Sequence, residues 1–416
     1  MKQGYLSQYF KGVAAKVLSA VETDVVTSNQ HEFNGVAPLK DIFGAETQRF
    51  ETQFIYLNDV DDEPVVDTGF LTWYDARENH STRTEYRMYF PTTAVSVCAA
   101  EGDNLFIGLR PDNTILVVVT EGGSTIGNQL KWLFGIGDDR TSGFSVHDDL
   151  ENEQNRIAFS SRFILERLGI QVEENVDSYL EEMLHQFGGT FPKTKAFSEY
   201  ARATLADVLP LDNPDAVLMS WMEREEVLFR TLEKHLISER LKNGFDGDVD
   251  AFLSFSLSVQ NRRKSRVGQA LENHVETLLI ERHIKYDRTK VTENKSKPDF
   301  IFPGISEYHD LSFDVSFLTM LGVKSTCKDR WRQILSEAKR ISHKHLLTLE
   351  AAISENQTAE MEDNHLQLVV PGSLQDTYTP KQRKWLMNVF SFIEHVQFRQ
   401  RMSLQHARRA STGGSK

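Results

Sequence analysis

Two stretches, 297-KPDFIFPG-304 and 323-VKSTCKDRWRQILSEA-338, decide the fold of the second half of this 416-residue chain. Asp299 stands at the start of a short apolar run that is predicted to be a strand. Lys324 lies 25 residues later, near the end of a second predicted strand, and Glu337 follows 13 residues after it on a predicted helix. Strands that alternate with helices predict an α/β core for this half.

The helix predicted over 329–343 has two different faces. Its apolar face carries residues at helical offsets of 3, 4, 7 and 10: Trp331, Ile334, Leu335, Ala338 and Ile341. Arg330, Gln333 and Glu337 fall at i, i+3 and i+7 on another face. One face is therefore expected to pack, while the other presents polar groups and a carboxylate in line.

These residue types suit the hydrolysis of a phosphodiester bond. Carboxylates hold Mg²⁺ through one or two oxygens, and the metal activates water and neutralises developing charge. A lysine beside the phosphate stabilises the transition state as a compact charge. Glu272, on a helix predicted over 267–283, adds a further carboxylate. On spacing alone, ordinary surface charges on an α/β domain explain Asp299, Lys324 and Glu337 equally well.

Longer motifs resemble one family. The segments 261-NRRKSRVGQALENHVE-276, 297–304 and 323–338, together with SEYHD at 306–310 and LQLVVPGSL at 366–374, resemble the catalytic domain of the EcoRII family of type II (IIE) restriction endonucleases. The similarity spans roughly 190–400. It implies a C-terminal α/β restriction-endonuclease-like core of the PD-(D/E)xK type.

The resemblance also implies roles for individual residues. Asp299 and Glu337 would be the metal ligands, with Mg²⁺ as the cofactor, and Lys324 the catalytic lysine. Glu272 would be the supporting carboxylate of the first core helix, and Tyr308 would lie beside the site.

A basic cluster is a candidate for DNA binding in a chain of net charge −13. Arg262, Arg263, Lys264 and Arg266 place four positive charges in five positions. We interpret them as a clamp on DNA phosphates, which gives affinity and register but carries no sequence information. The alternative is the solvated start of a helix.

Lys328, Asp329 and Arg330 form a second candidate for DNA contact. A base beside an acid can read donors and acceptors in the major groove, and in relatives of EcoRII this stretch performs that readout. The alternative is a helix N-terminal turn with Asp329 as the cap. Trp221 is a candidate for stacking on a flipped base; a core tryptophan of an amphipathic helix is an equally good interpretation.

The first 150 residues are rich in short β-branched and aromatic runs, which predicts an all-β barrel or sandwich. The predicted strands are FETQFIYL (50–57), FLTWYD (70–75), YRMYF (86–90), AVSVCAA (94–100), NLFIGL (104–109) and TILVVV (114–119). Residues 150–185 are acidic and partly helical.

A thinner resemblance covers 81-STRTEYRMY-89, which is similar to a Thr-Arg-x-Glu-x-Arg stretch of the EcoRII effector domain, a DNA-binding β pseudobarrel. It implies that His31, Arg83, Glu85 and Arg87 bind effector DNA. A predicted strand carries Arg83, Glu85 and Arg87 at alternating positions, so these three side chains share a face. The family has lysines near Ser81 and at Tyr86, which leaves the recognised sequence open, and an exposed salt-bridged strand is the alternative.

The domain organisation follows from these changes in composition and predicted secondary structure along the chain. We expect an N-terminal effector domain with a helical extension over 1–187, a linker at 188–195 (GGTFPKTK), a catalytic domain over 196–403 and an appended tail without a core pattern over 404–416.

Composition narrows the functional class. Two cysteines, Cys98 and Cys327, lack metal-ligand spacing, so a zinc or disulfide framework is not expected. The first twenty residues lack an apolar signal region, and no apolar run approaches the ~20 residues of a membrane helix. We therefore expect a cytoplasmic protein with no membrane association, and its negative charge argues against a general polyanion binder.

The sequence as a whole predicts a magnesium-dependent, site-specific type II restriction endonuclease of double-stranded DNA, whose N-terminal domain autoinhibits the nuclease. The expected partners are DNA, a second copy in a homodimer, and a cognate DNA methyltransferase of the same system that acts without physical contact. A modification-dependent or repair nuclease remains an alternative, as does a catalytically silent DNA-binding regulator.

Overall fold

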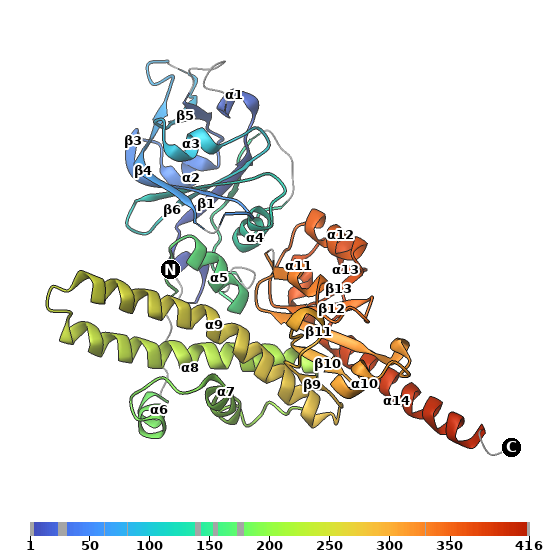
Figure 1. Ribbon diagram of the computed structural model, residues 1–416. Helices are drawn as coiled ribbons and strands as arrows, with labels where there is room; N and C mark the ends of the chain where they lie inside the picture. Colours follow the sequence, from blue (N-terminus) through green and yellow to red (C-terminus); the bar gives the residue numbers. More distant parts are fainter. Residues whose placement is uncertain are drawn as a thin grey trace. The chain divides into compact units, whose positions relative to one another are not determined.

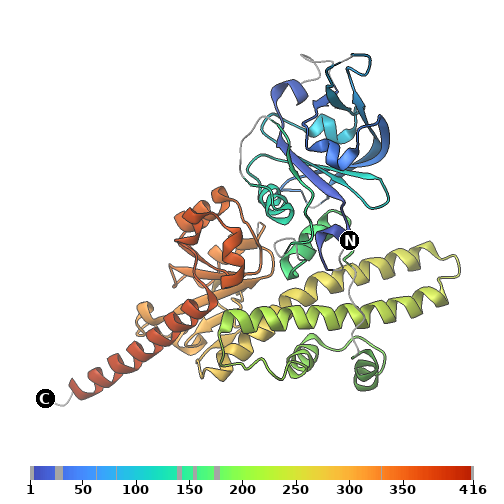
Figure 2. The same cartoon turned by 180° about the vertical axis from the view of Figure 1, so that it is seen from behind.

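The structure is a computed structural model that describes residues 4–413, apart from 24–30, 62, 81, 138–142, 153–156, 173–178 and 329. Its contacts divide the chain into two units (Figures 1 and 2). The first unit contains residues 1–173 and the short segment Ala351–Gln357. The second contains residues 174–350 and 358–416.

An eight-stranded sheet organises the first unit. Its strand order is β2-β5-β4-β3-β7-β6-β1-β8, with β3 and β7 parallel and the other neighbours antiparallel. The elements of this unit are η1 (Leu6–Gln8), β1 (Gly12–Val17), α1 (Ala20–Thr23), β2 (Glu32–Asn34), α2 (Leu39–Phe43), β3 (Gln48–Leu57), β4 (Val65–Asp75), β5 (Tyr86–Tyr89), α3 (Ala94–Cys98), β6 (Asn104–Leu109), β7 (Ile115–Thr120), α4 (Thr125–Phe134), β8 (Ser145–His147) and α5 (Phe159–Arg167).

Both faces of this sheet are covered by apolar side chains. The central strands β6 and β7 are buried at every position, as their unbroken apolar sequences require. Helices α2 and α3 contribute to the core on one face, and α4 and α5 to the core on the other. The expected strands over 50–57, 70–75, 86–90, 104–109 and 114–119 are present, but the unit includes helices and is not all-β.

The prediction of a strand over 94–100 was wrong, because Ala94–Cys98 is the helix α3. Thr93 and Ser96 form a capping box: the Thr93 hydroxyl accepts from Ser96 N at 3.0 Å and the Ser96 hydroxyl accepts from Thr93 N at 2.9 Å. The β-branched composition favoured a strand, but this local cap satisfies the first amides of a helix instead.

Segment 351–357 belongs to the first unit through its contacts with α4. Gln129 Nε2 donates to the carbonyl of Ala351 at 3.1 Å, and Ser354 N donates to the hydroxyl of Thr125 at 3.1 Å. A segment far along the chain therefore completes the N-terminal unit, which no local pattern indicates.

The second unit contains a five-stranded mixed sheet in the order β13-β12-β11-β10-β9. Strands β9, β10 and β11 are antiparallel, whereas β11, β12 and β13 are parallel. Its elements are α6 (Leu180–Phe187), α7 (Thr194–Ala203), α8 (Pro214–Asn243), α9 (Val249–Glu281), β9 (Asp287–Arg288), η3 (Glu293–Lys295), β10 (Phe300–Phe302), α10 (Ile305–His309), η4 (Val315–Phe317), β11 (Thr319–Lys324), α11 (Arg330–Leu335), β12 (Lys344–Thr348), α12 (Glu355–Asp363), β13 (Leu366–Val369), η5 (Gly372–Thr377), α13 (Pro380–Arg383) and α14 (Val389–Gly413). This arrangement confirms an α/β core for the second half.

The unit boundary differs from the linker expected at 188–195. Helix α6 precedes that stretch, yet Met183 packs in one cluster with Phe197 of α7 and Phe229 of α8. Helix α7 already begins at Thr194. The glycines and proline of 188–195 therefore form a turn inside the second unit.

Several helix boundaries differ from the expected ones. The helix predicted over 329–343 ends at Leu335, and Ala338 has a positive φ of 44°. The last helix, predicted over 381–398, is divided into α13 and α14, and α14 continues to Gly413 through much of the expected tail. The division has a tertiary cause. The Asp215 carboxylate of α8 accepts from the amides of Val389 and Phe390 and so caps α14.

Strand β12 was not predicted from the sequence. Its five residues are buried throughout and lie between β11 and β13 in the sheet. These residues follow the helix predicted over 329–343 and were given no element of their own, because their place in the sheet depends on pairing with β11 and β13.

Candidate active site

Asp299 and Lys324 meet at one edge of the second sheet, the edge formed by the start of β10 and the end of β11. Asp299 directly precedes β10 and Lys324 ends β11, and these two strands are antiparallel neighbours. Lys324 Nζ donates to Asp299 Oδ2 at 2.9 Å, and the amide of Val323 donates to the same oxygen at 2.7 Å. The two side chains retain 14% and 21% exposure, so the ion pair is reachable from outside the protein.

Glu337 brings a second carboxylate to this edge, although it lies past the end of α11 and not on the helix as expected. Helix α11 can approach β11 closely because residue 322 is glycine: a Cβ there would lie 2.5 Å from Cδ1 of Ile334. Burial and the negative charge of Asp299 raise the pKa of Glu337 to about 7. Its Oε2 atom is buried and accepts no hydrogen bond from the residues that the structure describes.

Glu272 faces the same group from α9. Burial and the charge of Asp299 raise its pKa, although the Arg288 guanidinium opposes that shift. Arg288, on β9, donates to Glu272 at 2.9 Å, to Glu276 at 2.7 Å and to Asn273 at 3.0 Å. Arg288 therefore fixes the orientation of the Glu272 carboxylate. Sequence reasoning missed it, because a two-residue strand gives no pattern.

Tyr308 lies in a neighbouring hydrogen-bond group and is fully buried. Its hydroxyl donates to the Glu293 carboxylate at 2.6–2.7 Å and accepts from the amide of Arg340 at 3.3 Å. Burial and Glu293 raise the pKa of Tyr308 to about 12. The hydroxyl of Tyr308 therefore has Glu293 and Arg340 as its partners, and its place beside the site stays a prediction.

Lys344 connects this group with the acidic edge. Its ammonium is buried and donates to the carbonyl of Ile341 at 2.8 Å. Burial lowers the pKa of Lys344, while the negative charges of Glu337 and Glu293 oppose that shift. Neither Glu293 nor Lys344 was expected at the site, and the sequence offers no signal beyond their residue types.

The residues present fit a divalent cation. No group of three or more His, Cys, Asp and Glu side chains converges as a ready metal cage in the described part of the chain. Mg²⁺ is, however, usually held by one or two carboxylates, with water and phosphate completing its shell. Glu337, whose Oε2 has no hydrogen-bond partner in the described part of the chain, and Asp299 form a carboxylate pair that a cation would neutralise.

The segment expected to read bases begins four residues after Lys324. Lys328 has a positive φ of 29°, and Arg330 is the exposed first residue of α11. Asp329 lies outside the described residues. The amide of Cys327 donates to the Glu350 carboxylate, which holds the start of this segment against the end of β12.

The basic cluster at 262–266 lies in the middle of α9 and is not a helix start. Arg266 is 5% exposed and forms ion pairs with Glu225 and Glu226 of α8. Arg263 donates to Glu233 at 2.8 Å. A buried, paired guanidinium is not presented to phosphate, so the structure contradicts the DNA-clamp interpretation for Arg266.

The other two members of the cluster are less enclosed. Arg262 stacks over the ring of Phe191 at 4.1 Å, and Lys264 is exposed. Lys264 therefore remains the clearest candidate for a phosphate contact.

Trp221 is a core residue of α8 in this structure. It is 1% exposed, and its ring lies 5.6 Å from that of His274 and 5.6 Å from the Arg202 guanidinium. This agrees with the packing interpretation. An extruded base would reach its face only after these neighbours moved.

The candidate effector residues lie on β5 or just before the neighbouring strands β2 and β5 of the first unit. His31 precedes β2, which pairs with β5, and its Nε2 lies 3.4 Å from the Thr92 hydroxyl. Arg87 forms ion pairs with Glu32 at 2.9 Å and Glu85 at 2.6 Å. Arg83 is exposed in the segment before β5, so it and Glu85 do not lie on that strand as expected.

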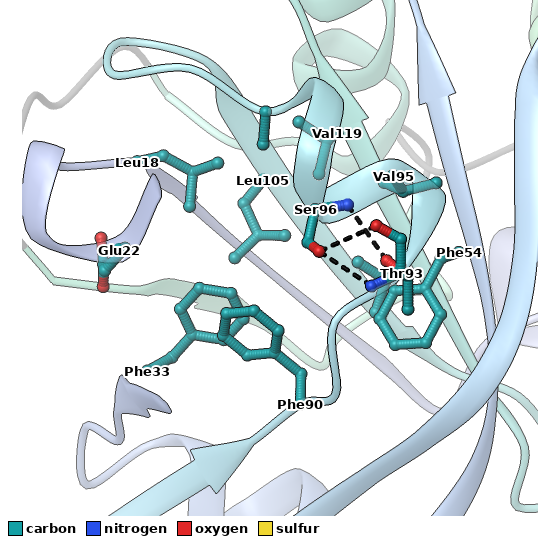
Figure 3. A pocket seen from close by; sticks show the side chains of 12 residues that line it. Leu18, Glu22, Phe33, Phe54, Phe90, Thr93, Val95, Ser96, Leu105 and Val119 are labelled. Carbon is teal, nitrogen blue, oxygen red and sulfur yellow. Dashed lines mark hydrogen bonds between the residues drawn. The ribbon is translucent and has the colours of Figure 1, made fainter. Parts of the chain in front are cut away.

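A small apolar pocket lies close to these residues in the first unit (Figure 3). Phe33 and Phe90 stack at 4.4 Å in its wall, and its Thr93 and Ser96 side chains are engaged in the cap of α3. The pocket is continuous with the hydrophobic core and contains no unpaired catalytic group among the described residues.

No helix in the described part of the whole chain is long and apolar enough to cross a membrane.

Comparison with known proteins supports the family resemblance of the second unit. Residues 229–393 match the family model described as EcoRII C terminal. The type II restriction enzyme EcoRII of Escherichia coli is 44% identical over 185 residues, which are 44% of this chain and 46% of that protein. The chain thus spans about half the length of the curated relative that it matches. These findings confirm the resemblance expected for the C-terminal part.

Two solved structures show weaker likeness. Metal-depleted Ecl18kI in complex with uncleaved, modified DNA has 18% identity and a TM-score of 0.44, covering 56% of this chain and 86% of that one. The complex of restriction endonuclease PspGI with substrate DNA has 18% identity and a TM-score of 0.43, covering 50% and 93%. Likeness at this level carries no argument about function.

Proposed function

We propose that the chain is a type II restriction endonuclease that hydrolyses double-stranded DNA at a specific site with Mg²⁺ as the cofactor. The observation that carries the proposal is the Asp299–Lys324 ion pair beside Glu337, whose Oε2 has no hydrogen-bond partner among the described residues. These groups stand within the segment that matches the EcoRII C-terminal family. A catalytically silent DNA-binding regulator would have no need of them.

Each residue of the site has a chemical role in this proposal. Asp299 and Glu337 would hold the metal, which when bound supplies an activated water and neutralises phosphate charge. Lys324 Nζ places a positive charge where the charge of the scissile phosphate increases in the transition state. Glu272, oriented by Arg288, supports the acidic edge from α9.

A double-stranded DNA substrate implies specific contacts and partners for this chain. Lys264 would contact phosphates, and Lys328, Asp329 and Arg330 would read base edges close to the catalytic lysine. A duplex site that reads the same on both strands requires two symmetry-related active sites, so we propose a two-fold homodimer. A cognate methyltransferase would protect the host DNA.

The N-terminal unit would act as an effector domain that restrains the nuclease until it binds DNA. In this proposal His31, Arg83, Glu85 and Arg87 contact the effector DNA. Regulation of this kind requires that the effector bind the active state more tightly than the restrained state.

A digest of unmodified plasmid with Mg²⁺ tests the function. Discrete bands from the wild-type chain, lost in an Asp299→Ala control, support a restriction endonuclease. Cleavage confined to modified DNA would instead support a modification-dependent nuclease, and specific binding without any cleavage would support a silent regulator.

A further inference from the structure

A tight turn follows Glu337 in the chain. Ala338 is fully buried and has a positive φ of 44°, and its carbonyl accepts from the amide of Ile341 at 2.9 Å. An alanine adopts this left-handed conformation only where the surrounding structure imposes it. Glu337 is therefore presented by a turn that follows α11, and the direction of its carboxylate depends on the groups that hold that turn in place.

Arg340 holds the turn through its side chain. Its guanidinium donates to the carbonyls of Tyr308, Asp310 and Phe313, the last two at 3.0 and 3.2 Å. The first of these carbonyls belongs to α10, and the other two belong to the loop that follows it. A guanidinium presents five N–H donors in a rigid planar fork, so it can bond several carbonyls at once. One side chain thus joins the turn after Glu337 to a separate element of the unit.

The backbone of the same turn is bonded to a second pair of side chains. The amide of Arg340 donates to the Tyr308 hydroxyl at 3.3 Å, and the amide of Lys339 donates to Glu293 Oε2 at 3.3 Å. Tyr308 and Glu293 are themselves joined, because the tyrosine hydroxyl donates to that carboxylate at 2.6–2.7 Å. The side-chain and backbone bonds together impose the left-handed conformation of Ala338.

The sequence of this segment favours a different conformation. Residues 329–343 carry the apolar spacing of one continuous helix, in which Ala338 would have an ordinary helical φ. The observed turn therefore forms against the local preference and depends on the tertiary bonds of Arg340. Without those bonds the segment can return to the helical path, which gives Glu337 a different backbone direction.

We propose that Arg340 is a positioning residue of the nuclease site, because it holds the turn that keeps the Glu337 carboxylate beside Asp299. Its guanidinium bonds α10 and the loop after it, so Arg340 acts through Glu337 and not on the metal or the phosphate. The catalytic consequence rests on the proposed function, whereas the position of Glu337 is a property of the fold. The alternative is that Arg340 only fastens α10, in which case its removal leaves the surroundings of Glu337 unchanged.

A double-mutant cycle in urea unfolding tests the position of Glu337 without any nuclease activity. The full-length chain is unfolded at pH 8 in EDTA, with and without Glu337→Gln, in the wild-type and Arg340→Ala backgrounds. The charge of Asp299 acts on Glu337, and glutamine removes that repulsion, so Glu337→Gln should raise the urea midpoint of the wild type. In Arg340→Ala the same substitution should raise the midpoint by less than half as much, because the released carboxylate moves into solvent.

Arg332→Ala is the matched control, since Arg332 lies on α11 and pairs with Glu360 at 2.9 Å, apart from the Arg340 contacts. Glu337→Gln should have its full wild-type effect in that background. Arg340→Lys keeps the charge without the fork, and it replaces Arg340→Ala in the cycle if circular dichroism shows that the alanine variant is unfolded. An equal effect of Glu337→Gln in the wild-type and Arg340 backgrounds, whatever its size, overturns the proposal.

The Mg²⁺ dependence of plasmid cleavage measures the consequence for the proposed site. Loss of a group that orients a metal ligand costs about 10–100-fold in metal affinity. Arg340→Ala should therefore raise the Mg²⁺ concentration for half-maximal cleavage about tenfold, with most of the maximal rate recovered at saturating Mg²⁺, and Arg332→Ala should leave that concentration unchanged. A lower rate with an unchanged half-maximal concentration overturns the positioning role. A wild type that cuts no plasmid removes the proposed nuclease function instead, and the urea cycle then decides the role of Arg340 by itself.

Discussion

Replacement of Glu337 by Gln should stabilise the metal-free protein at alkaline pH while it abolishes cleavage. Burial and Asp299 raise the pKa of Glu337 from 4.5 to about 7. The folded chain therefore binds this proton more tightly than the unfolded chain does. The free energy of unfolding should fall as the pH rises from 4.5 to about 7, and the full penalty should be present above that pH.

The size of the effect follows from the same values. A pKa that moves this far corresponds to about 3 kcal/mol, since one pH unit is worth about 1.4 kcal/mol. The side chain is only partly buried, so solvent screening reduces the expected effect to about 2 kcal/mol. Glutamine is neutral at every pH and has the same shape, so Glu337→Gln should remove the penalty at pH 8 and change little at pH 4.5.

Urea unfolding in EDTA at the two pH values measures this difference. Glu362→Gln is a suitable control, because Glu362 is exposed on α12 and its substitution should leave the pH dependence parallel to that of the wild type. The reasoning is refuted if the gap between Glu337→Gln and the wild type is the same at pH 4.5 and pH 8. Titration with Mg²⁺ at pH 6 should also release about one proton per site from the wild type and none from Glu337→Gln.

Four further predictions concern the two units. Asp299→Ala and Lys324→Ala should each reduce cleavage at least a hundredfold, about 2.7 kcal/mol of barrier, and preserve specific binding in a gel shift; residual cleavage above that level would remove the residue from the catalytic group. Arg266→Ala should destabilise the fold by about 3 kcal/mol in urea unfolding, because it removes a buried guanidinium that pairs with two buried carboxylates of α8. Lys264→Ala should leave stability unchanged and reduce the salt dependence of DNA binding by about one unit of slope; equal stability of the two variants would contradict the structural role of Arg266, and an unchanged slope would contradict the phosphate contact of Lys264. Deletion of residues 1–190 should increase cleavage of a one-site DNA if the N-terminal unit restrains the nuclease, and a folded, DNA-binding truncation that cuts no faster would show that the unit recruits DNA instead.

Periodicity and local motifs predicted the parts of this protein that depend on neighbouring residues. Unbroken apolar runs identified the buried strands β6 and β7, and the Pro-Asp motif before β10 identified one edge of the second sheet. The resemblance carried by 261–276, 297–304 and 323–338 was confirmed by the family match. These signals are local, because alternation, capping and motif spacing are written within a few residues of one another.

The end of α11, the strand β12 and the ion pairs of α9 depended on partners far along the chain. Arg266 and Lys264 are two residues apart and carry the same charge, yet one is buried between helices and the other is exposed. Trp221 likewise gave no local sign that His274 and Arg202 would enclose it.

The sequence was enough to predict that the second half is an α/β core containing an Asp, a Lys and a Glu suited to phosphodiester chemistry. The three-dimensional fold was needed to see that Asp299 and Lys324 pair at 2.9 Å, that Glu337 beside them has a carboxylate oxygen without a partner among the described residues, and that Arg288 orients Glu272. The physical reason is that the charge state and pairing of a side chain are set by burial and by the groups packed around it, which come from different elements.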